Sequence, residues 1–369
     1  MNIFSSPSSY PIGLDISDRS LKLVQLNKKR QSIILQTLSK WHLPPGFIQD
    51  GIIKNKEGVI ESIYKLINHT IIGKVTNKKV VACLPEPKTF IKLVKIESTN
   101  GDFKDDLIHE IEKNVPYSID EINYDWQVIE KKQGVQKVLI SAIEKNIAEQ
   151  YHEVLKSAGL TPIALEVEAV SIIRSLLPAS ANKHPTILIV DIGAQRSSCI
   201  AYSSNTILFT MSLPISGNKT TDIIAKKLKL TTEKAEIAKV ISGLNPLNVN
   251  GVIAEALEQK IHNLTSKLNN VIKYLAKHYP EYGEVSDIYL CGGGAQINGL
   301  ADILTKKLKT PTKIGNVFIN INIHPRVEEK HLHEEFATLK KIAKEHKIKQ
   351  NFSLRFATAV GLALRGIYH

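Results

Sequence analysis

Two stretches of the chain share one pattern of apolar and polar positions. Around Asp15 and again around Asp191, an apolar run ends in Asp-Ile, passes through a turn of small and polar residues, and continues into a second apolar run. Each stretch predicts a β-hairpin with an acidic residue close to its turn. Because the same unit occurs twice, the sequence predicts a fold with two related halves.

The residues after the first hairpin predict a small mixed α+β subdomain that spans roughly residues 85–150. Apolar runs typical of strands flank a Pro-Glu-Pro turn, and stretches with apolar residues at helical spacing alternate with further strands. Gly159 is expected to end the last of these helices. The predicted strands are residues 79–84, 89–96, 124–130 and 136–143, and the predicted helices are residues 105–115 and 146–158.

The second hairpin is followed by a mainly helical pattern. A strand then leads into a loop of three glycines, which a further helix follows. A charged stretch predicts a surface helix after it, and an apolar helix closes the pattern. The predicted helices are residues 220–230, 232–242, 252–278, 298–307, 325–350 and 352–365, the strand is residues 287–290, and the glycines are residues 292–294.

Length and composition indicate a folded protein of two domains or lobes. The 369 residues exceed a typical single core, and 43% of them are hydrophobic against 23% charged, as in ordinary globular proteins. No apolar run reaches the length of about 18 residues that a membrane span needs. Residues 1–10 carry neither the basic nor the apolar segment of a secretory signal. We therefore expect the protein to stay in the cytosol.

The formal net charge of +12 raises the question of a nucleic-acid partner. The lysines are spread along the whole chain and no basic stripe alternates with aromatic residues, so we expect no nucleic-acid binding. The charge instead indicates a general richness in lysine, or attraction to an anionic membrane face. Cys83, Cys199 and Cys291 lie apart in apolar runs, which predicts buried free thiols and neither a disulfide nor a zinc site. His331 and His333 are expected on a solvated helix face, and no histidine is expected to bind a metal.

Candidate chemistry comes from the two hairpins together with the glycine loop. A bound triphosphate requires hydrogen-bond donors near its oxygens, room for the backbone to approach, and carboxylates that hold Mg²⁺ through water. Asp15 and Asp191 supply carboxylates, the turns supply backbone N–H groups and serine hydroxyls, and residues 292–294 leave room for an adenine ring. A single glycine loop or a single hairpin is often an ordinary turn, so the prediction depends on the order of the elements.

That order resembles the ATPase core shared by actin, sugar kinases and heat-shock chaperones. Within this superfamily the chain resembles the PilM family of type IV pilus assembly proteins, which are related to the cell-division protein FtsA. The middle segments are the most specific, because kinases and chaperones do not share them. The resemblance covers nearly the whole chain and is carried by GLDISDRSLKLVQL at 13–26, EIEKNVPYSIDEINYDWQVI at 110–129, VLISAIEKNIAEQYHEVLKSAGLTPIALEVEA at 138–169, ILIVDIGAQRSS from 187, LPISGNKTTDIIAKKLKL from 213, YLCGGGAQINGLADIL from 289 and FATAVGLALRG near the end.

The resemblance implies an α/β fold of the actin-like ATPase type, with two ribonuclease-H-like lobes and a small α+β subdomain inserted in the first lobe. An expected division of the chain goes with it. Residues 1–84 with 151–185 form the first lobe, on which helix 352–365 packs; residues 85–150 form the inserted subdomain; residues 186–216 with 286–351 form the second lobe; and residues 217–285 form its helical subdomain.

The resemblance also implies which residues bind MgATP. Most of them lie in the two hairpins, while an acid and a base on a helix flank the ribose and adenine; by spacing alone, that pair is equally compatible with a surface ion pair. Serine stands at position 17, where the family usually has glycine, and if the turn needs a positive φ there it costs about 1 kcal/mol and lowers nucleotide affinity. The implied nucleotide-binding residues are Asp15, Ser17, Arg19, Lys22, Gly193, Gln195, Gly217, Asn218, Glu236, Lys239, Gly293 and Gly294, and Mg²⁺ would be held through water by Asp15, Glu168 and Asp191.

The function implied by the resemblance is that of a cytoplasmic ATP-binding adaptor at the inner-membrane platform of a type IV pilus. The nucleotide would mainly fix lobe closure, with slow hydrolysis at most, and no catalytic residue is assigned. A groove beside the inserted subdomain would bind the cytoplasmic N-terminal peptide of a PilN-like membrane protein, and the adaptor would work with the pilus motor ATPases. Phe90 and Tyr117 are the candidates for this groove, and both are equally compatible with core packing.

Three other classes of protein share the fold. An FtsA-type filament protein is expected to have an amphipathic membrane-targeting helix after the core, whereas this sequence stops at His369, soon after Arg365. A sugar or acetate kinase requires a carboxylate that acts as general base toward a substrate hydroxyl, and the sequence offers no candidate outside the metal set. A chaperone-type ATPase requires a substrate-binding domain, for which no residues remain.

Overall fold

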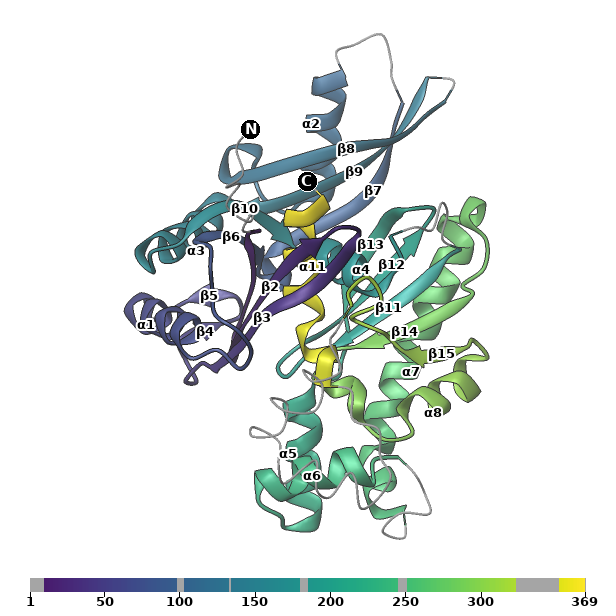
Figure 1. The fold of residues 1–369 in the computed structure, drawn as a ribbon. Helices are drawn as coiled ribbons and strands as arrows, with labels where there is room; N and C mark the ends of the chain where they lie inside the picture. The colour runs from purple at the N-terminus through teal and green to yellow at the C-terminus, as the bar shows by residue number, and fades with distance from the viewer. Residues whose placement is uncertain are drawn as a thin grey trace.

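The computed structural model describes residues 10–97, 103–132, 134–179, 185–244, 251–322 and 352–368. Two large β-sheets form the framework, and the C-terminal helix runs between them (Figure 1). The charged helix predicted at 325–350, with His331 and His333, lies outside the described residues. Within those residues, no helix combines the length and the apolar character needed to cross a bilayer.

In the described part of the chain, five strands form the first sheet in the order β10-β6-β1-β2-β3. The first hairpin is the antiparallel pair of β1 and β2, and β6 lies parallel to β1 on its other side. Because side chains alternate along a strand, Ile12 and Leu14 pack with helices α1 and α3, while Gly13 faces the C-terminal helix. The bounds are β1 Ile12–Ser17, β2 Ser20–Lys29, β3 Ser32–His42, β6 Lys79–Leu84, β10 Thr161–Val167, α1 Lys56–Asn68 and α3 Lys145–Ser157, with a small hairpin of β4 Ile48–Gln49 and β5 Ile52–Ile53 between β3 and α1.

Eight strands of the described ranges form the second sheet, in the order β15-β14-β11-β12-β13-β7-β9-β8. The second hairpin is β11 with β12, and β14 lies parallel to β11 as β6 does to β1. Strands from the 85–150 region join this sheet through one pairing of Phe209 in β13 with Lys92 in β7. The inserted region is therefore continuous with the second sheet, although it follows the first hairpin in sequence. The bounds are β7 Thr89–Glu97, β8 Ile122–Lys132, β9 Val135–Glu144, β11 Ile187–Ile192, β12 Ser197–Ser203, β13 Thr206–Ser212, β14 Asp287–Cys291 and β15 Thr312–Ile314.

The remaining helices follow from their apolar spacing. In α7, buried residues such as Leu257, Ile261, Leu264 and Leu268 recur every three or four positions, so one face of this long helix packs on the core. Helices α5 and α6 lie together at one end of the molecule, at the bottom of Figure 1. The bounds are α2 Phe103–Asn114, α4 Glu168–Leu176, α5 Gly217–Leu228, α6 Thr232–Ile241, α7 Val252–His278, α8 Leu300–Leu308 and α11 Ala357–Tyr368, with short 3-10 turns η1 Glu86–Lys88, η2 Ile119–Glu121, η4 Pro280–Tyr282, η5 Gly293–Gln296 and η6 Phe352–Phe356.

The C-terminal helix α11 is buried around most of its circumference, and Figure 1 shows it in yellow between the two sheets. It contacts β1, β2, β6 and α4. Two glycines allow this close approach. A Cβ atom on Gly13 would lie 2.3 Å from the carbonyl oxygen of Ala359, and one on Gly361 would lie 1.8 Å from that of Ser171. Small residues therefore set the distance between α11 and its neighbours.

The two predicted hairpins, the strands and helices of the 85–150 region, and the long helix 252–278 are confirmed. The helix predicted from residue 298 begins instead at Leu300, because Gly299 has a φ of 77° and precedes the helix. The closing helix is divided into η6 and α11. No element was predicted for residues 30–78, which contain β3, β4, β5 and α1.

Candidate functional site

A cavity of about 770 Å³ lies between the two hairpins. Its walls come from both sheets, from helices α4, α5 and α6, from the glycine loop and from the segment that leads into α11. All the residues predicted to bind the nucleotide or the metal border this cavity, and their binding roles remain predictions. Those residues are Asp15, Ser17, Arg19, Lys22, Glu168, Asp191, Gly193, Gln195, Gly217, Asn218, Glu236, Lys239, Gly293 and Gly294.

The first hairpin places a buried ion pair at the cavity. Asp15 and Lys22 are opposite each other in the register of β1 and β2, and Lys22 Nζ lies 2.6 Å from Asp15 Oδ2. Burial alone would lower the pKa of Lys22, but the Asp15 carboxylate outweighs it and the pKa is raised. The thiol of Cys83, at the end of the parallel strand β6, lies 3.6 Å from Asp15 Oδ1 as a weak donor. The Asp15 carboxylate is thus held from two sides.

Ser17 does not carry the backbone strain that its replacement of glycine suggested. It is the last residue of β1, and its φ is not among the positive values found in the described residues. Its hydroxyl donates to the carbonyl oxygen of Ser20 at 2.9 Å and so closes the turn. The condition under which serine would weaken nucleotide binding is therefore not met.

The second hairpin repeats this arrangement. Asp191 pairs with Ser198 across β11 and β12, and the thiol of Cys291 in the parallel strand β14 lies 3.5 Å from Asp191 Oδ1. Burial, with a contribution from Asp15, raises the pKa of Asp191 to about 6. Ser197 borders the cavity, and its buried hydroxyl has no hydrogen-bond partner in the part of the chain that the structure describes. Such a hydroxyl suits a ligand oxygen.

Glu168 comes from a third direction, at the start of α4. Its Oε1 accepts a hydrogen bond from Thr358 of the C-terminal segment at 2.9 Å, and its backbone carbonyl accepts one from Ser171 at 2.7 Å. Burial and the nearby Asp15 and Asp191 carboxylates raise its pKa well above the ordinary value.

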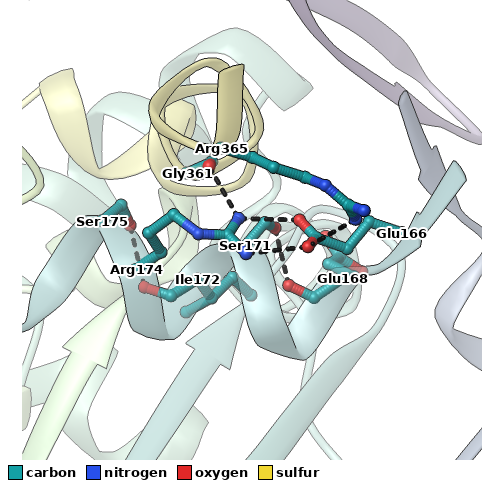
Figure 2. Close-up of polar contacts among 8 residues, drawn as sticks. All are labelled: Glu166, Glu168, Ser171, Ile172, Arg174, Ser175, Gly361 and Arg365. Atoms are coloured by element: carbon teal, nitrogen blue, oxygen red, sulfur yellow. Dashed lines mark hydrogen bonds and ion pairs between the residues drawn. The ribbon is translucent and has the colours of Figure 1, made fainter. Parts of the chain in front are cut away.

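A second acidic residue, Glu166, fixes the strand that leads to Glu168 (Figure 2). Both of its carboxylate oxygens accept hydrogen bonds from the guanidinium of Arg174 at 2.7 Å, and Arg365 of α11 adds a contact at 3.0 Å. Arg174 also donates to the carbonyl oxygen of Gly361 at 2.9 Å. This network joins β10, α4 and α11, and so holds Glu168 and Thr358 at the cavity.

Asp15, Glu168 and Asp191 together suit an ion held through water. Each borders the cavity, and their mutual repulsion contributes to the raised pKa values of Glu168 and Asp191. Within the described residues, no group of three or more acidic, histidine or cysteine side chains could hold a metal ion directly. Mg²⁺ keeps several of its waters and prefers carboxylate partners, so the donor set fits Mg²⁺ bound through its hydration shell.

Glu236 and Lys239 form a buried pair beside the start of α5. Lys239 Nζ lies 2.5 Å from Glu236 Oε2 and donates to Thr221 Oγ1 at 2.8 Å and to the carbonyl oxygen of Gly217 at 3.3 Å. Lys239 is only 2% exposed, so the alternative of a solvated surface pair is wrong for the lysine. Burial lowers the pKa of Lys239, whereas Lys239 lowers the pKa of Glu236 against the effect of burial.

In the glycine loop, two positions lack room for a side chain because neighbouring protein atoms lie too close. A Cβ on Gly292, whose φ is 77°, would lie 2.3 Å from Asp191 Oδ1, and one on Gly294 would lie 2.3 Å from Ile192 Cγ2. Gly293 instead faces the side chain of Arg355, with 3.4 Å to the nearest atom. Gly292 and Gly294 thus pack closely on β11, while the role of the loop beside an adenine ring remains a prediction.

Sequence analysis did not assign several residues that border the cavity. Arg196 and Asp18 lie next to assigned residues in the two turns, and an ion pair joins them across the cavity. Glu86 follows β6 in η1 and faces the cavity, while its carboxylate makes no hydrogen bond within the described residues. The signal for Glu86 was its place at the carboxyl end of a strand parallel to the Asp15 strand. The partner of Arg196 could not be found this way, because the two residues are far apart in sequence.

Phe90 and Tyr117 do not border this cavity. Phe90, in β7, is partly buried against the cluster that includes Val94 and Leu107, and Tyr117 is 36% exposed in the segment between α2 and η2. A hydrogen bond with Glu144 raises the pKa of Tyr117. Their role in a peptide groove remains a prediction.

Comparisons with known proteins agree with this architecture. The profile of the family described as "Type IV pilus assembly protein PilM" matches residues 13–367. A solved "PilM-PilN type IV pilus biogenesis complex" contains a chain that is 23% identical, with 98% of this chain and 99% of that chain covered and a TM-score of 0.76.

Two further structures share the fold at lower similarity. The ethanolamine utilization protein EutJ from Carboxydothermus hydrogenoformans is 14% identical, over 97% of this chain and 90% of that one, with a TM-score of 0.54. MreB 5 of Spiroplasma citri, solved with AMPPNP bound, is 15% identical, over 92% of this chain and 99% of that one, with a TM-score of 0.50. The chain thus has the actin-like ATPase fold.

Proposed function

The chain belongs to the PilM family of type IV pilus assembly proteins, and on this premise we propose that it is a cytoplasmic ATP-binding adaptor of the inner-membrane pilus platform. The observation that carries the proposal is the cavity to which both hairpins contribute, with the Lys22–Asp15 pair on one side and Asp191 on the other. A cavity of this size suits a nucleotide. A protein of the same fold has been solved with AMPPNP bound, which supports ATP as the ligand.

The division of the chain that fits this proposal is the one implied by the sequence. The second lobe carries the helical subdomain, and the inserted subdomain is continuous with the second sheet through the β7–β13 pairing. Nucleotide in the cleft would then fix the relative position of both lobes and of the insert. We propose residues 1–84 with 151–185 as the first lobe together with helix 352–365, 85–150 as the insert, 186–216 with 286–351 as the second lobe, and 217–285 as its helical subdomain.

Mg²⁺ would accompany the nucleotide. Asp15, Glu168 and Asp191 would hold its waters, and the ion would neutralise the phosphate charge that these carboxylates otherwise repel. Lys22 would meet the phosphates from the side of the first hairpin. The direct test is titration calorimetry with MgATP, where we expect one site per chain; absence of binding would overturn the proposal.

Replacing Glu236 with glutamine tests the nucleoside side of the site. The carboxylate lies 2.5 Å from Thr221 Oγ1 and is paired with Lys239, so glutamine removes a charged acceptor while keeping the shape. We expect MgATP and MgADP affinities to fall alike, by about tenfold, the value of one charge-assisted hydrogen bond. The matched control is Glu255→Gln, which removes the exposed pair with Lys227 and should leave both affinities unchanged. Unchanged nucleotide affinity in the Glu236 variant would remove this residue from the site.

We also propose that a PilN-like peptide binds beside the inserted subdomain and tethers the protein to the membrane. The similar chain solved as a PilM–PilN complex supports a partner of this class. Through this contact, the adaptor would connect the membrane platform with the pilus motor ATPases.

The exposed Tyr117 allows the peptide proposal to be tested without disturbing the core. In fluorescence anisotropy with a labelled PilN-like N-terminal peptide, Tyr117→Ala should weaken binding about tenfold, as expected for an aromatic contact residue. Tyr64→Ala is the control, because Tyr64 is 63% exposed on α1, outside the insert. Equal peptide affinity of both variants would exclude Tyr117 from the groove.

Phosphoryl transfer is a second candidate function, because Glu86 supplies a carboxylate outside the metal set. It faces the cavity from the turn η1 that follows β6, and burial raises its pKa, as suits a general base. Release of ADP from MgATP in the presence of a sugar or acetate, and its loss in Glu86→Gln, would favour a kinase over the adaptor.

A further inference from the structure

An arginine of the second hairpin reaches the first hairpin across the cavity. Arg196 lies in the turn between β11 and β12, and its Nη2 is 2.5 Å from Asp18 Oδ2 in the turn between β1 and β2. The same nitrogen is 3.0 Å from Asp50 Oδ1 in the β4–β5 hairpin. The two hairpin turns that border the cavity are therefore joined by one guanidinium.

The two acidic partners of Arg196 are unequal. The side chain of Asp18 is 11% exposed, and its carboxylate also accepts the backbone N–H groups of Asp50 at 3.1 Å and Gly51 at 3.2 Å. The side chain of Asp50 is 86% exposed, so its contact with Arg196 is weakened by water. Asp18 is the fixed partner, and Arg196 is the group that can exchange.

The loop that carries Asp50 cannot easily move with Arg196. A Cβ on Gly51 would lie 2.5 Å from Pro85 Cβ, and the hydroxyl of Tyr151 donates to the carbonyl oxygen of Gly51 at 3.1 Å. Glu86, which follows Pro85, borders the same cavity; burial raises its pKa, and the Arg196 guanidinium offsets part of that rise. Asp18 and Asp50 of the first lobe and Glu86 at the start of the insert thus lie around an arginine of the second lobe.

A terminal phosphate would compete with these carboxylates. An arginine guanidinium binds two phosphate oxygens at once as well as it binds a carboxylate, and a terminal phosphate carries more charge than one carboxylate. In the proposed binding mode, with the nucleoside beside Glu236 and Lys239, a terminal phosphate would lie between the two turns that Arg196 joins. A diphosphate would leave the Arg196–Asp18 pair in place.

We propose that Arg196 distinguishes a nucleoside triphosphate from a diphosphate, by exchanging its ion pair with Asp18 for the terminal phosphate. The inference rests on the proposed nucleotide binding and identifies Arg196 as the residue whose contacts differ between a triphosphate and a diphosphate. Triphosphate binding then replaces a direct contact between the two lobes with a contact through the ligand, so occupancy by ATP and by ADP gives different lobe contacts.

The test compares MgATP and MgADP by titration calorimetry in the full chain. Arg196→Gln should weaken MgATP about tenfold and change MgADP less than about twofold, because one charge-assisted contact to the terminal phosphate is lost. Asp18→Asn should act in the opposite direction and strengthen MgATP, since the competitor of the phosphate loses its charge. Arg30→Gln is the matched control, because it removes an exposed positive charge of the β2–β3 turn away from the cavity.

The outcomes separate this inference from the proposed function. If the unmodified protein binds neither nucleotide, the proposed function itself fails. If it binds both and Arg196→Gln weakens both equally, Arg196 only holds the lobes together and the inference is overturned. Thermal unfolding of each variant without nucleotide shows whether the variant is folded. If Arg196→Gln does not fold, Asp18→Asn still tests the inference. Unchanged or weaker MgATP binding in Asp18→Asn would overturn it.

Discussion

Replacing Asp191 with asparagine should stabilise the ligand-free protein at pH 7 and weaken its stabilisation by MgATP. The Asp191 pKa is raised from 3.8 to about 6, because the carboxylate is buried and lies near Asp15. Between these two pH values the folded protein binds more protons than the unfolded chain, so the free energy of unfolding falls as pH rises through this window. Above it, the ionised carboxylate is destabilising by about 2–3 kcal/mol, which asparagine avoids.

The same substitution should remove the Mg²⁺-dependent part of nucleotide binding. Asparagine keeps the acceptor for Cys291 but cannot contribute charge to the hydrated ion. Loss of a group that acts on a metal through its shell lowers affinity by about 10- to 100-fold. If the variant is more stable than the unmodified protein without ligand but gains less stability from MgATP, Asp191 acts in ligand binding rather than in packing.

Urea unfolding at pH 4.5 and pH 7.5, with and without MgATP, measures both effects of the Asp191 substitution. The unmodified protein should gain stability from this group on acidification, and Asp191→Asn should lack that contribution. Asp302→Asn, at an exposed position of α8, serves as the control for removal of one negative charge. Destabilisation by Asp191→Asn at pH 7.5, or an undiminished response to MgATP, would contradict the assignment.

Gly361→Ala should destabilise the protein by about 3 kcal/mol or more, because the added methyl group overpacks a backbone contact. In a helix, alanine in place of glycine ordinarily stabilises by about 1 kcal/mol, so the expected change has the opposite sign to helix propensity. The cause is the carbonyl oxygen of Ser171, which would lie 1.8 Å from the new Cβ. Relief would require α11 to move away from α4 and to break the contact between Arg174 and the Gly361 carbonyl.

Denaturant unfolding of Gly361→Ala beside Gly58→Ala checks this expectation. Gly58 is also helical, in α1, but its added methyl would meet only the ring of Phe47, a side chain that can rotate. We expect the Gly58 variant to remain within about 1 kcal/mol of the unmodified protein. A neutral or stabilising Gly361→Ala would mean that α11 does not pack on α4 at this distance.

The parts of the site that lie on local patterns were predictable from sequence. Asp15 and Asp191 each lie near the end of an apolar strand, and a local hairpin pattern is enough to place each of them beside its own polar turn. The pair of Glu236 and Lys239 could be found on one helix face. Its burial could not, because it depends on Thr221 and Gly217 of the preceding helix.

The parts that sequence could not predict depend on contacts between distant segments. Nothing near Arg196 in the sequence indicates that it would pair with Asp18 and Asp50. Likewise, the insert joins the second sheet through the pairing of Phe209 with Lys92, which lie far apart in the sequence. Local sequence also gave no sign that Gly292 packs against Asp191, because Asp191 lies on a distant strand. A run of glycines in the sequence indicates that a close neighbour leaves no room for a side chain, but it does not identify that neighbour.

The position of α11 determines when the first lobe can become complete during synthesis. Strand β1 is synthesised long before the helix that covers Gly13 and packs against α4. Until α11 has been synthesised, the face of the first sheet that contains Gly13 lacks the helix that covers it, and Glu168 lacks its hydrogen-bond donor Thr358. The apolar cluster of the second sheet also includes Ala359, Val360 and Leu364 of α11, so the core of the second lobe depends on the same helix. Both lobes are therefore completed only once α11 has been synthesised and has packed between the two sheets.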